Sequence, residues 1–380
     1  MILKKTLCSL AILGAFAAGS AQAQTSVTLY GIIDAGVVTQ SNGNAAGDRL
    51  NSFEDGQILP SIYGMKGKED LGGGLTAGFN LEGGFNAGNG QHNSPGVYQS
   101  QIFGREAKVT LGGDWGTVGA GLQVDPALIA SISTEPRGLT DSFSMLEFWI
   151  GSTLFNGGGL AATSSGSLTG GIFDVNSLTY TYTKNGLYVG LEYGFGGIAG
   201  ANSAGSTESI GVSYAYSGFT VSGSYAKENT IDPTGVTGGA SEITDFGLGY
   251  DFGNFAVRAQ YGEFKASIGI FGGEGSNYSN DVKSWGIGAD WKTSVGNKIN
   301  LAYYDAKDDG AGFGGKTTEI ALLDIFALSK RTQLYAQVAD VKADANAGLS
   351  AMIGGVYATP NLLVESGSTV YFGVGIQHSF

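Results

Sequence analysis

The sequence predicts an all-β protein: a closed antiparallel transmembrane β-barrel of about 16 strands. Three observations support this fold. After residue 23 the chain repeats a unit of alternating strand, short turn, alternating strand and longer polar loop. Within the strands, apolar side chains alternate with small or polar ones. The last strand ends on an aromatic residue with nothing left to cover its free edge, and closing the sheet into a barrel removes that edge.

The two terminal strands carry the closure argument. Side chains in Ser368 to Phe380 alternate with the period of two that a strand requires. The mostly apolar face consists of Val370, Phe372, Val374, Ile376, His378 and Phe380. The segment Ser26 to Val38 alternates in the same way. We therefore expect the first and last strands to pair.

The first 23 residues predict a signal peptide that is removed, which leaves residues 24–380 as a single barrel domain. Lys4 and Lys5 are followed by a mostly apolar run and then by the cleavage signal Ala21-Gln22-Ala23. The run is too short for a membrane anchor, since a spanning helix needs about 20 apolar residues. Cys8 lies at the beginning of this run rather than at its end, which argues against a lipoprotein.

Composition excludes several classes of protein. The chain has 20 basic residues, and removing Lys4 and Lys5 leaves 18 against 33 acidic residues, a formal net charge of −15. We expect no nucleic-acid partner for so acidic a chain. The 66 glycines come with only 6 prolines and no triplet repeat, which excludes collagen, and 11% aromatic residues argue against disorder.

Turns and loops set the number of strands. Short turns such as Lys184-Asn185-Gly186 and Ser217-Gly218 suit hairpins, because asparagine and glycine adopt positive φ. Longer polar connections fall near residues 40–60, 87–101, 197–207, 229–241, 267–280, 308–316 and 343–367. This spacing fits strands of about 9 to 11 residues that cross a membrane.

Aromatic residues cluster at strand ends, which is typical of the girdle at a membrane interface. The cluster comprises Tyr180, Tyr182, Tyr214, Tyr216, Tyr250 and Phe252. The alternative is a soluble β-sandwich with these rings in its core. We favour the barrel, because the other strand face carries Thr, Ser, Gly, Asn and Glu, which cannot form a dry core.

One connection breaks the pattern. The stretch from Asp125 to Asn176 carries many apolar residues, including Phe143 and Trp149, that an external loop would not need. A barrel of about 16 strands leaves an aqueous channel, so we expect the part from Asp125 to about Phe155 to fold inward. The residues expected to face the passage are Asp125, Glu135, Asp141 and Glu147. A surface loop is the alternative, and the later Gly-rich part stays undecided.

Several segments, in order along the chain, resemble the trimeric general porins of Gram-negative outer membranes, particularly those of β-proteobacteria. They are SVTLYGIIDAG at residues 26–36, KGKEDLGGGL at 66–75, GREAKVTL at 104–111, GTVGAGLQ at 116–123, ALSKRTQLYA at 327–336 and GIQHSF at 375–380. The resemblance implies a sixteen-stranded homotrimer in the cell outer membrane, whose inward third loop narrows a channel for passive diffusion of small hydrophilic solutes. It also implies contact with outer-membrane lipid, lipopolysaccharide and the assembly machinery, for which Phe380 is the signal.

Departures from the family bear on selectivity. The resemblance implies arginines where this chain has Ile62 and Leu122. Lys66 and Lys68 share the inward parity of the first position, so we include both among the pore-constriction candidates. Arg105 has the parity of lipid-facing residues, which leaves a place at the rim, in a trimer contact or in a slipped register. We expect at most a weak anion preference, with mild cation preference or near neutrality favoured.

Other functions have weaker support in the sequence. His92 and His378 are the only histidines, so a His-based triad or metal site would need one of them, and we predict no enzyme, no cofactor and no metal. Asp305, Asp308 and Asp309 could bind calcium, but we favour a solvated acidic loop for these residues. A substrate-selective barrel, an adhesin or a receptor without general pore activity remains the alternative to a general porin.

Overall fold

The computed structural model describes residues 26–44, 46–92, 101–138, 140, 142–145, 149, 172–231, 237–266, 280–311, 314–345, 347 and 367–380. The predicted signal peptide, residues 1–23, lies outside this part and stays a prediction. Strands β1 to β17 and the helix α2 (Pro126–Ile132) make up the regular structure considered below. In the described part, no helix is both long enough and apolar enough to cross a membrane.

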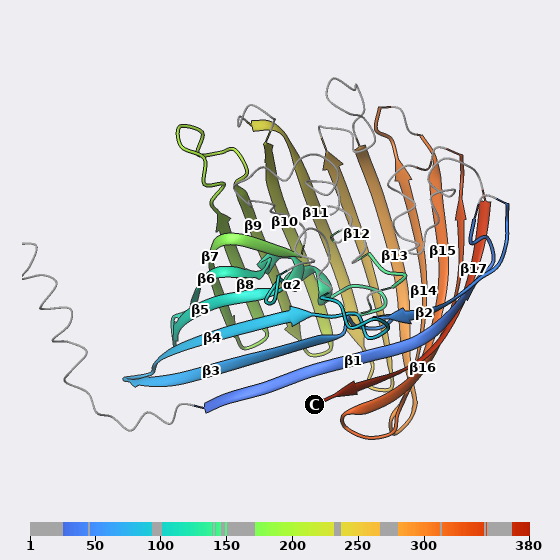
Figure 1. Cartoon of the computed structure of the whole chain (residues 1–380), viewed down its shortest axis with the longest axis horizontal. Coiled ribbons are helices and arrows are strands. Elements are labelled where there is room, and N and C mark those ends of the chain that lie inside the picture. The colour runs from blue at the N-terminus through green and yellow to red at the C-terminus, as the bar shows by residue number, and fades with distance from the viewer. Residues whose placement is uncertain are drawn as a thin grey trace, which may run out of the picture.

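The strands form one antiparallel sheet (Figure 1). They are β1 (Ser26–Gln40), β2 (Leu50–Asp55), β3 (Ile62–Gly72), β4 (Leu75–Gly84), β5 (Glu106–Gly113), β6 (Gly116–Val124), β7 (Phe173–Lys184), β8 (Leu187–Gly194), β9 (Thr207–Tyr216), β10 (Phe219–Ile231), β11 (Thr237–Asp251), β12 (Phe255–Ala266), β13 (Asn280–Ser294), β14 (Asn297–Asp308), β15 (Lys316–Ala327), β16 (Thr332–Ala343) and β17 (Gly367–Ser379).

The sheet closes on itself as predicted. β1 pairs with β17 from Ile32 opposite Ser379 to Gln40 opposite Tyr371. Gly31 and Phe380 add two backbone hydrogen bonds, of 3.0 and 3.3 Å between nitrogen and oxygen. Figure 1 shows β1 meeting β17, so strands from the two ends of the chain lie side by side. The closed sheet has no free edge at this junction.

Two of the strands together make one wall strand of the barrel. β3 pairs with the first half of β1, and β2 pairs with its second half. Between them, the carboxylate of Asp34 accepts hydrogen bonds of 3.0 Å from the backbone N–H groups of Ile58 and Leu59, and one of 2.5 Å from the Tyr335 hydroxyl. These bonds hold the break in place. The barrel therefore has sixteen strands around its wall, as the sequence predicts.

Alternation separates the two faces of the wall. On β13, Trp285 and Ile287 are about half exposed on the outer face, whereas Ser284 and Asp290 are buried on the inner face. The apolar residues of β17 from Val370 to Ile376 are likewise exposed on the outer face. An apolar outer surface of this extent is favourable in contact with lipid hydrocarbon and unfavourable in contact with water.

Turns and aromatic residues lie where the sequence places them. Asn185 and Gly186 both have positive φ (52° and 83°), as do Ser217 and Gly218 (49° and 88°), which is the type I′ geometry of two-residue hairpins. Near the turns of β9 to β12, exposed or partly exposed rings contact one another. Their centroids are 6.3 Å apart for Tyr214 and Tyr216, 4.3 Å for Phe219 and Tyr250, and 4.5 Å for Tyr250 and Phe252.

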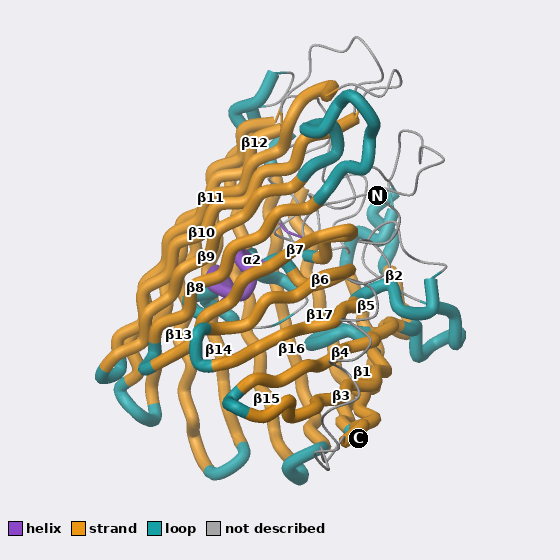
Figure 2. Tube along the Cα trace, turned by 90° about the vertical axis from the view of Figure 1, so that its left-hand side faces the viewer, coloured by secondary structure: helices purple, strands orange, loops and turns teal. Residues whose placement is uncertain are grey.

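The helix α2 begins the long connection after β6 and lies against β8 to β11 (Figures 1 and 2). Asp125 is its N-cap and accepts a hydrogen bond of 2.7 Å from the backbone N–H of Ala127, and Pro126 occupies its first position. Glycines make the close approach possible. A Cβ at Gly211 would lie 2.6 Å from the Pro126 carbonyl oxygen, and a Cβ at Gly190 would lie 2.4 Å from Pro126 Cβ.

Candidate pore-lining site

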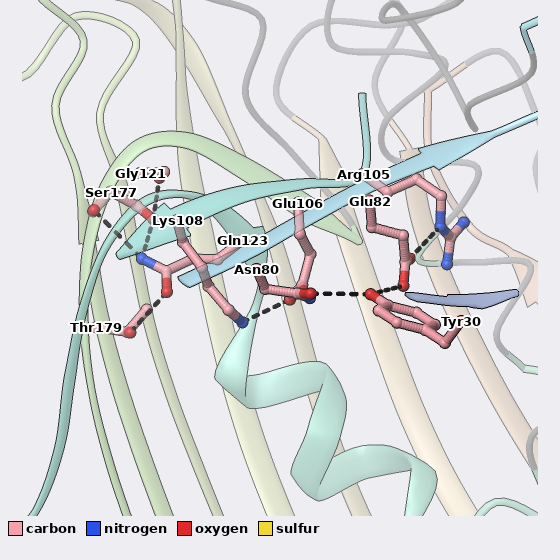
Figure 3. Close-up of polar contacts among 10 residues, drawn as sticks. All are labelled: Tyr30, Asn80, Glu82, Arg105, Glu106, Lys108, Gly121, Gln123, Ser177 and Thr179. Atoms are coloured by element: carbon pink, nitrogen blue, oxygen red, sulfur yellow. Dashed lines mark hydrogen bonds and ion pairs between the residues drawn. The ribbon is translucent and has the colours of Figure 1, made fainter. Parts of the chain in front are cut away.

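A ladder of charged and polar side chains follows the inner face of β1, β4 and β5 (Figure 3). It arises because residues two apart on a strand share a face, and because Glu82 lies opposite Glu106 and Asn80 opposite Lys108 in the β4–β5 register. Two ion pairs mark its ends. Arg105 Nε lies 2.7 Å from Glu82 Oε1, and Lys108 Nζ lies 2.5 Å from Glu106 Oε1.

Tyr30 and Asn80 connect these ion pairs. The Tyr30 hydroxyl oxygen lies 2.9 Å from Glu82 Oε2 and 2.9 Å from Asn80 Oδ1, and its one proton serves one of them at a time. The Asn80 amide donates in turn to Glu106. Each carboxylate in the ladder therefore has both a cation and a neutral partner, so the ladder carries little net charge.

Arg105 does not follow the outward parity that the alternation of β5 predicts for it. The residue precedes β5, its backbone N–H bonds to the Glu82 carbonyl, and its guanidinium carbon lies 4.7 Å from the centroid of the Phe173 ring. The side chain consequently lies on the inner side with Glu82, and not among the lipid-facing residues of the strand. β5 begins at Glu106, so its alternation does not extend back to Arg105.

Lys66 and Lys68 have the predicted inward parity. Lys66 pairs with Thr28 across β1 and β3, and its Nζ lies 5.0 Å from the centroid of the Tyr30 ring. Both lysines and Lys108 line a cavity of about 510 Å³. Within the described chain neither Lys66 nor Lys68 has a carboxylate within 4.0 Å, so these two cations are not neutralised locally.

Asp125 and Glu135 occupy buried positions, with 4% and 2% of their surfaces exposed. Asp125 accepts a hydrogen bond of 2.5 Å from the Ser209 hydroxyl, and burial raises its pKa to about 6. Glu135 accepts hydrogen bonds from the Tyr304 hydroxyl (2.6 Å), the Arg137 N–H (2.7 Å) and the Met145 N–H (3.2 Å), and burial raises its pKa to about 7. We interpret both as anchors of the segment rather than as charges that meet solutes.

Further hydrogen bonds join this segment to the inner face of distant strands. The amide of Gln260 on β12 donates to the Ser131 hydroxyl (2.9 Å), and the amide of Asn300 on β14 donates to the Pro136 carbonyl (3.0 Å). Asp141 and Glu147, the other two acidic candidates, lie outside the described residues. The described contacts therefore concern only the segment's first half.

Arg137 is a candidate that the sequence reasoning missed. Its Nη2 donates to Gln337 Oε1 at 3.0 Å and its Nε to Thr140 Oγ1 at 3.3 Å, and 1% of its surface is exposed. Arg137 lines a cavity of about 820 Å³ together with Lys292 and Lys298. One sequence signal was available. Arg137 is the single basic residue between Lys108 and Lys184. A lone cation in a long acidic and apolar connection indicates a specific contact.

Other sequence candidates have ordinary environments. Ile62 and Leu122 are each 9% exposed, so neither places an apolar side chain in open water. Asp305 pairs with Lys316 at 2.6 Å and Asp309 with Lys307 at 2.5 Å, which gives these carboxylates lysine partners rather than one another.

Comparisons with known proteins agree with this architecture. The sequence model of the Gram-negative porin family matches residues 9–346. The chain is 32% identical over 391 residues to outer membrane porin protein 32 of Delftia acidovorans, and the alignment covers all of both chains. A porin of Bordetella pertussis is 27% identical over 429 residues, again with both chains fully covered.

Solved structures give the same result. The anion-selective porin from Comamonas acidovorans is similar with a TM-score of 0.73 and 28% identity, covering 94% of this chain and 100% of that one. OmpF of Salmonella typhi, at 17% identity, shares the fold with a TM-score of 0.61, covering 93% of this chain and 97% of its own. With its closed barrel and a family match over most of its length, this chain belongs to the Gram-negative porin family.

Proposed function

We propose that this protein is an outer-membrane porin whose water-filled channel lets ions and small hydrophilic solutes diffuse passively, without enzymatic turnover. The observation that carries this proposal is the separation of faces in a closed sixteen-stranded barrel, with apolar residues outside and the charged ladder inside. A polar interior of this width matches barrels that conduct water and ions rather than those filled by side chains.

Planar bilayer recording tests the proposal. Mature protein added to one side of the bilayer is expected to give stepwise, ohmic current increases of uniform size. An adhesin or receptor without pore activity would give no steps. A substrate-selective barrel would give steps that one class of solute blocks at low concentration, and liposome swelling with sugars of increasing size separates it from a general porin.

We further propose that the segment beginning at Asp125 narrows the channel. Support comes from its hydrogen bonds to Ser209, Gln260 and Asn300, which belong to the inner face of three different strands. Removing residues 125–155 is expected to raise the single-channel conductance. An unchanged conductance would mean that the segment lies outside the ion path.

Selectivity is proposed to be weak. Arg105 and Lys108 are each neutralised by a carboxylate at 2.5–2.7 Å, while Lys66 and Lys68 stay unneutralised. Ile62 and Leu122 add no charge where the family resemblance implies arginines. A balance of paired charges favours no more than a small preference for either sign of ion.

Assembly is proposed to depend on Phe380, in a homotrimer surrounded by lipid and lipopolysaccharide. The Phe380 backbone bonds to Gly31, and a Cβ at Gly31 would lie 2.2 Å from the Phe380 ring, so the terminal residue is fitted closely to the first strand. Deleting Phe380 is expected to reduce the amount of heat-modifiable trimer in the outer membrane. Trimer at the wild-type level would argue against a role in recognition by the assembly machinery.

A further inference from the structure

Three carboxylates from separate elements meet where the chain leaves β6 for α2. They belong to Asp125 before α2, Asp174 on β7 and Glu192 on β8, and each offers an oxygen that lies within 4.8 Å of the other two. All three are buried, with 4%, 1% and 7% of their surfaces exposed. Three like charges this close together in a buried site cannot all be ionised without a compensating positive charge.

Among the described residues, Lys108 is the cation that acts on Glu192, and it forms no direct ion pair with it. In the described part of the chain neither Asp125 nor Glu192 forms an ion pair. Lys108 is bound to Glu106 at 2.5 Å. Burial without a close cation is unfavourable for a carboxylate, so an added positive charge would stabilise an ionised Glu192 among the residues that the structure describes.

The oxygens of Glu192 are a second and independent indication. Neither forms a hydrogen bond of ordinary geometry with the residues that the structure describes. Two neighbouring hydroxyl groups donate to other acceptors, Ser209 to Asp125 (2.5 Å) and Thr179 to Gln123 (2.9 Å). The Ser177 hydroxyl, which lies 3.2 Å from the Gly121 carbonyl oxygen, is shared between that carbonyl and Glu192.

Space for a ligand lies beside the cluster. Asp125, Asp174 and Thr207 line a cavity of about 20 Å³, which is enough for one water-sized particle. The Thr207 hydroxyl is buried and likewise has no hydrogen-bond partner in the described chain. The cavity thus brings anionic and neutral oxygen atoms together and has room for one small ion or water molecule, with Lys227 and Trp149 also in its lining.

We propose that Asp125, Asp174 and Glu192 bind one divalent cation of the hard, oxygen-preferring class, with Ca²⁺ the best match. Calcium accepts six to eight oxygen ligands at flexible angles, and three carboxylates offer up to six. Mg²⁺ fits less well, because it demands octahedral geometry and retains water. A bound cation would tie the beginning of the long connection to β7 and β8, a role that does not require the channel to conduct.

Calorimetry with a defined metal tests the site. Mature chain is refolded in detergent without lipopolysaccharide, stripped with EDTA, and titrated with CaCl₂ or MgCl₂. The expected result is one Ca²⁺ per chain, weaker Mg²⁺ binding, and a higher unfolding temperature with Ca²⁺ than with EDTA. Glu192→Gln is expected to weaken Ca²⁺ binding at least tenfold, whereas Glu69→Gln, at the exposed end of β3, is expected to change nothing.

Two results would overturn the proposal. One is a wild-type barrel without binding heat and without any change in unfolding temperature at millimolar Ca²⁺, which would mean that the carboxylates are protonated instead. The other is unchanged Ca²⁺ affinity in Glu192→Gln. If Glu192→Gln does not refold, Asp174→Asn provides the same comparison at another ligand. Channel recordings are not part of this test, so its failure would leave the porin proposal intact.

Discussion

Glu82 and Glu106, on β4 and β5, each lie beside a cation, whereas Glu135, in the segment after α2, is held by a tyrosine hydroxyl and two backbone N–H groups. The paired glutamates are largely buried, with 12% and 10% of their side chains accessible, while their partners Arg105 and Lys108 keep 14% and 23% accessible. Glu135 is buried, and its pKa is raised to about 7. The same residue type thus carries charge toward the channel in one region and fastens a loop in the other.

The two regions therefore affect different properties: the β4–β5 ladder affects ion selectivity, and Glu135 affects the stability of the loop. Changes in the β4–β5 ladder should alter which ions pass, because they alter fixed charge near water without removing a buried anchor. Changes at Glu135 should alter the stability and position of the loop, because they leave buried donors unsatisfied.

The largest effect is expected for Glu135→Ala. The substitution leaves the Tyr304 hydroxyl and the N–H groups of Arg137 and Met145 without their acceptor. Each unsatisfied buried group costs about 1–3 kcal/mol. We expect a lower unfolding temperature by circular dichroism and larger or noisier single-channel currents.

Glu135→Gln is the matched control, since an amide keeps one acceptor oxygen in nearly the same volume. It should retain most of the stability and the wild-type current pattern. Equal conductance and equal unfolding temperatures for the alanine variant and the wild type would show that Glu135 does not anchor the segment.

A smaller effect is expected from pH. The folded-state pKa of Glu135, about 7, lies above its ordinary value of 4.5 because of burial. The folded protein therefore holds this proton more tightly than the unfolded chain does. The resulting stabilisation, of about 3 kcal/mol, is fully present below pH 4.5 and is lost as the pH rises through 7.

The comparison of wild type with Glu135→Gln isolates this group, because glutamine does not titrate. The difference in unfolding free energy between the two proteins should change between pH 4.5 and pH 7 and stay constant above that range. A constant difference from pH 4 to pH 8 would contradict the raised pKa.

The wall of the barrel could be predicted from the sequence more fully than its interior. Alternation in residues 368–380 and 26–38 was enough to predict which side chains face lipid and which strands close the sheet, since a period of two fixes both faces. The turns at Asn185-Gly186 and Ser217-Gly218 were predictable from residue types that favour positive φ, which all four residues adopt. These features are local, and local features are readable in sequence.

Interior contacts depend on residues that are far apart in the chain. The parity prediction for Arg105 failed because β5 begins one residue later, at Glu106. Arg137 bonds to Gln337, which lies 200 residues away in the chain. The partner of a carboxylate in this segment depends on which distant strands the segment contacts, and neither the period of the strands nor the composition specifies these contacts. Asp125 and Glu135 were expected to face the passage, and their burial was unpredictable for this reason.

The smallest expected effect concerns ion selectivity. At roughly 10 Å in water one unit charge changes the energy of a permeating ion by about 0.4 kcal/mol, which changes the permeability of each ion about twofold, in opposite directions, and the anion-to-cation ratio about fourfold. Glu82→Gln removes the ion-pair partner of Arg105 at 2.7 Å and leaves a positive charge at the inner wall. Ile62→Arg adds one on the neighbouring strand, and both variants should move the reversal potential toward anions in a tenfold salt gradient.

Lys66→Gln provides the opposite change, because Lys66 has no carboxylate partner in the described chain and lines the same cavity as Lys108. Its reversal potential should move toward cations by a similar amount, while conductance stays near the wild-type value since no loop anchor is touched. A strongly anion-selective wild type would contradict weak selectivity. Equal reversal potentials for Lys66→Gln, Glu82→Gln and the wild type would show that the β3–β5 wall does not face the ion path, and the division between charge and anchoring would then fail.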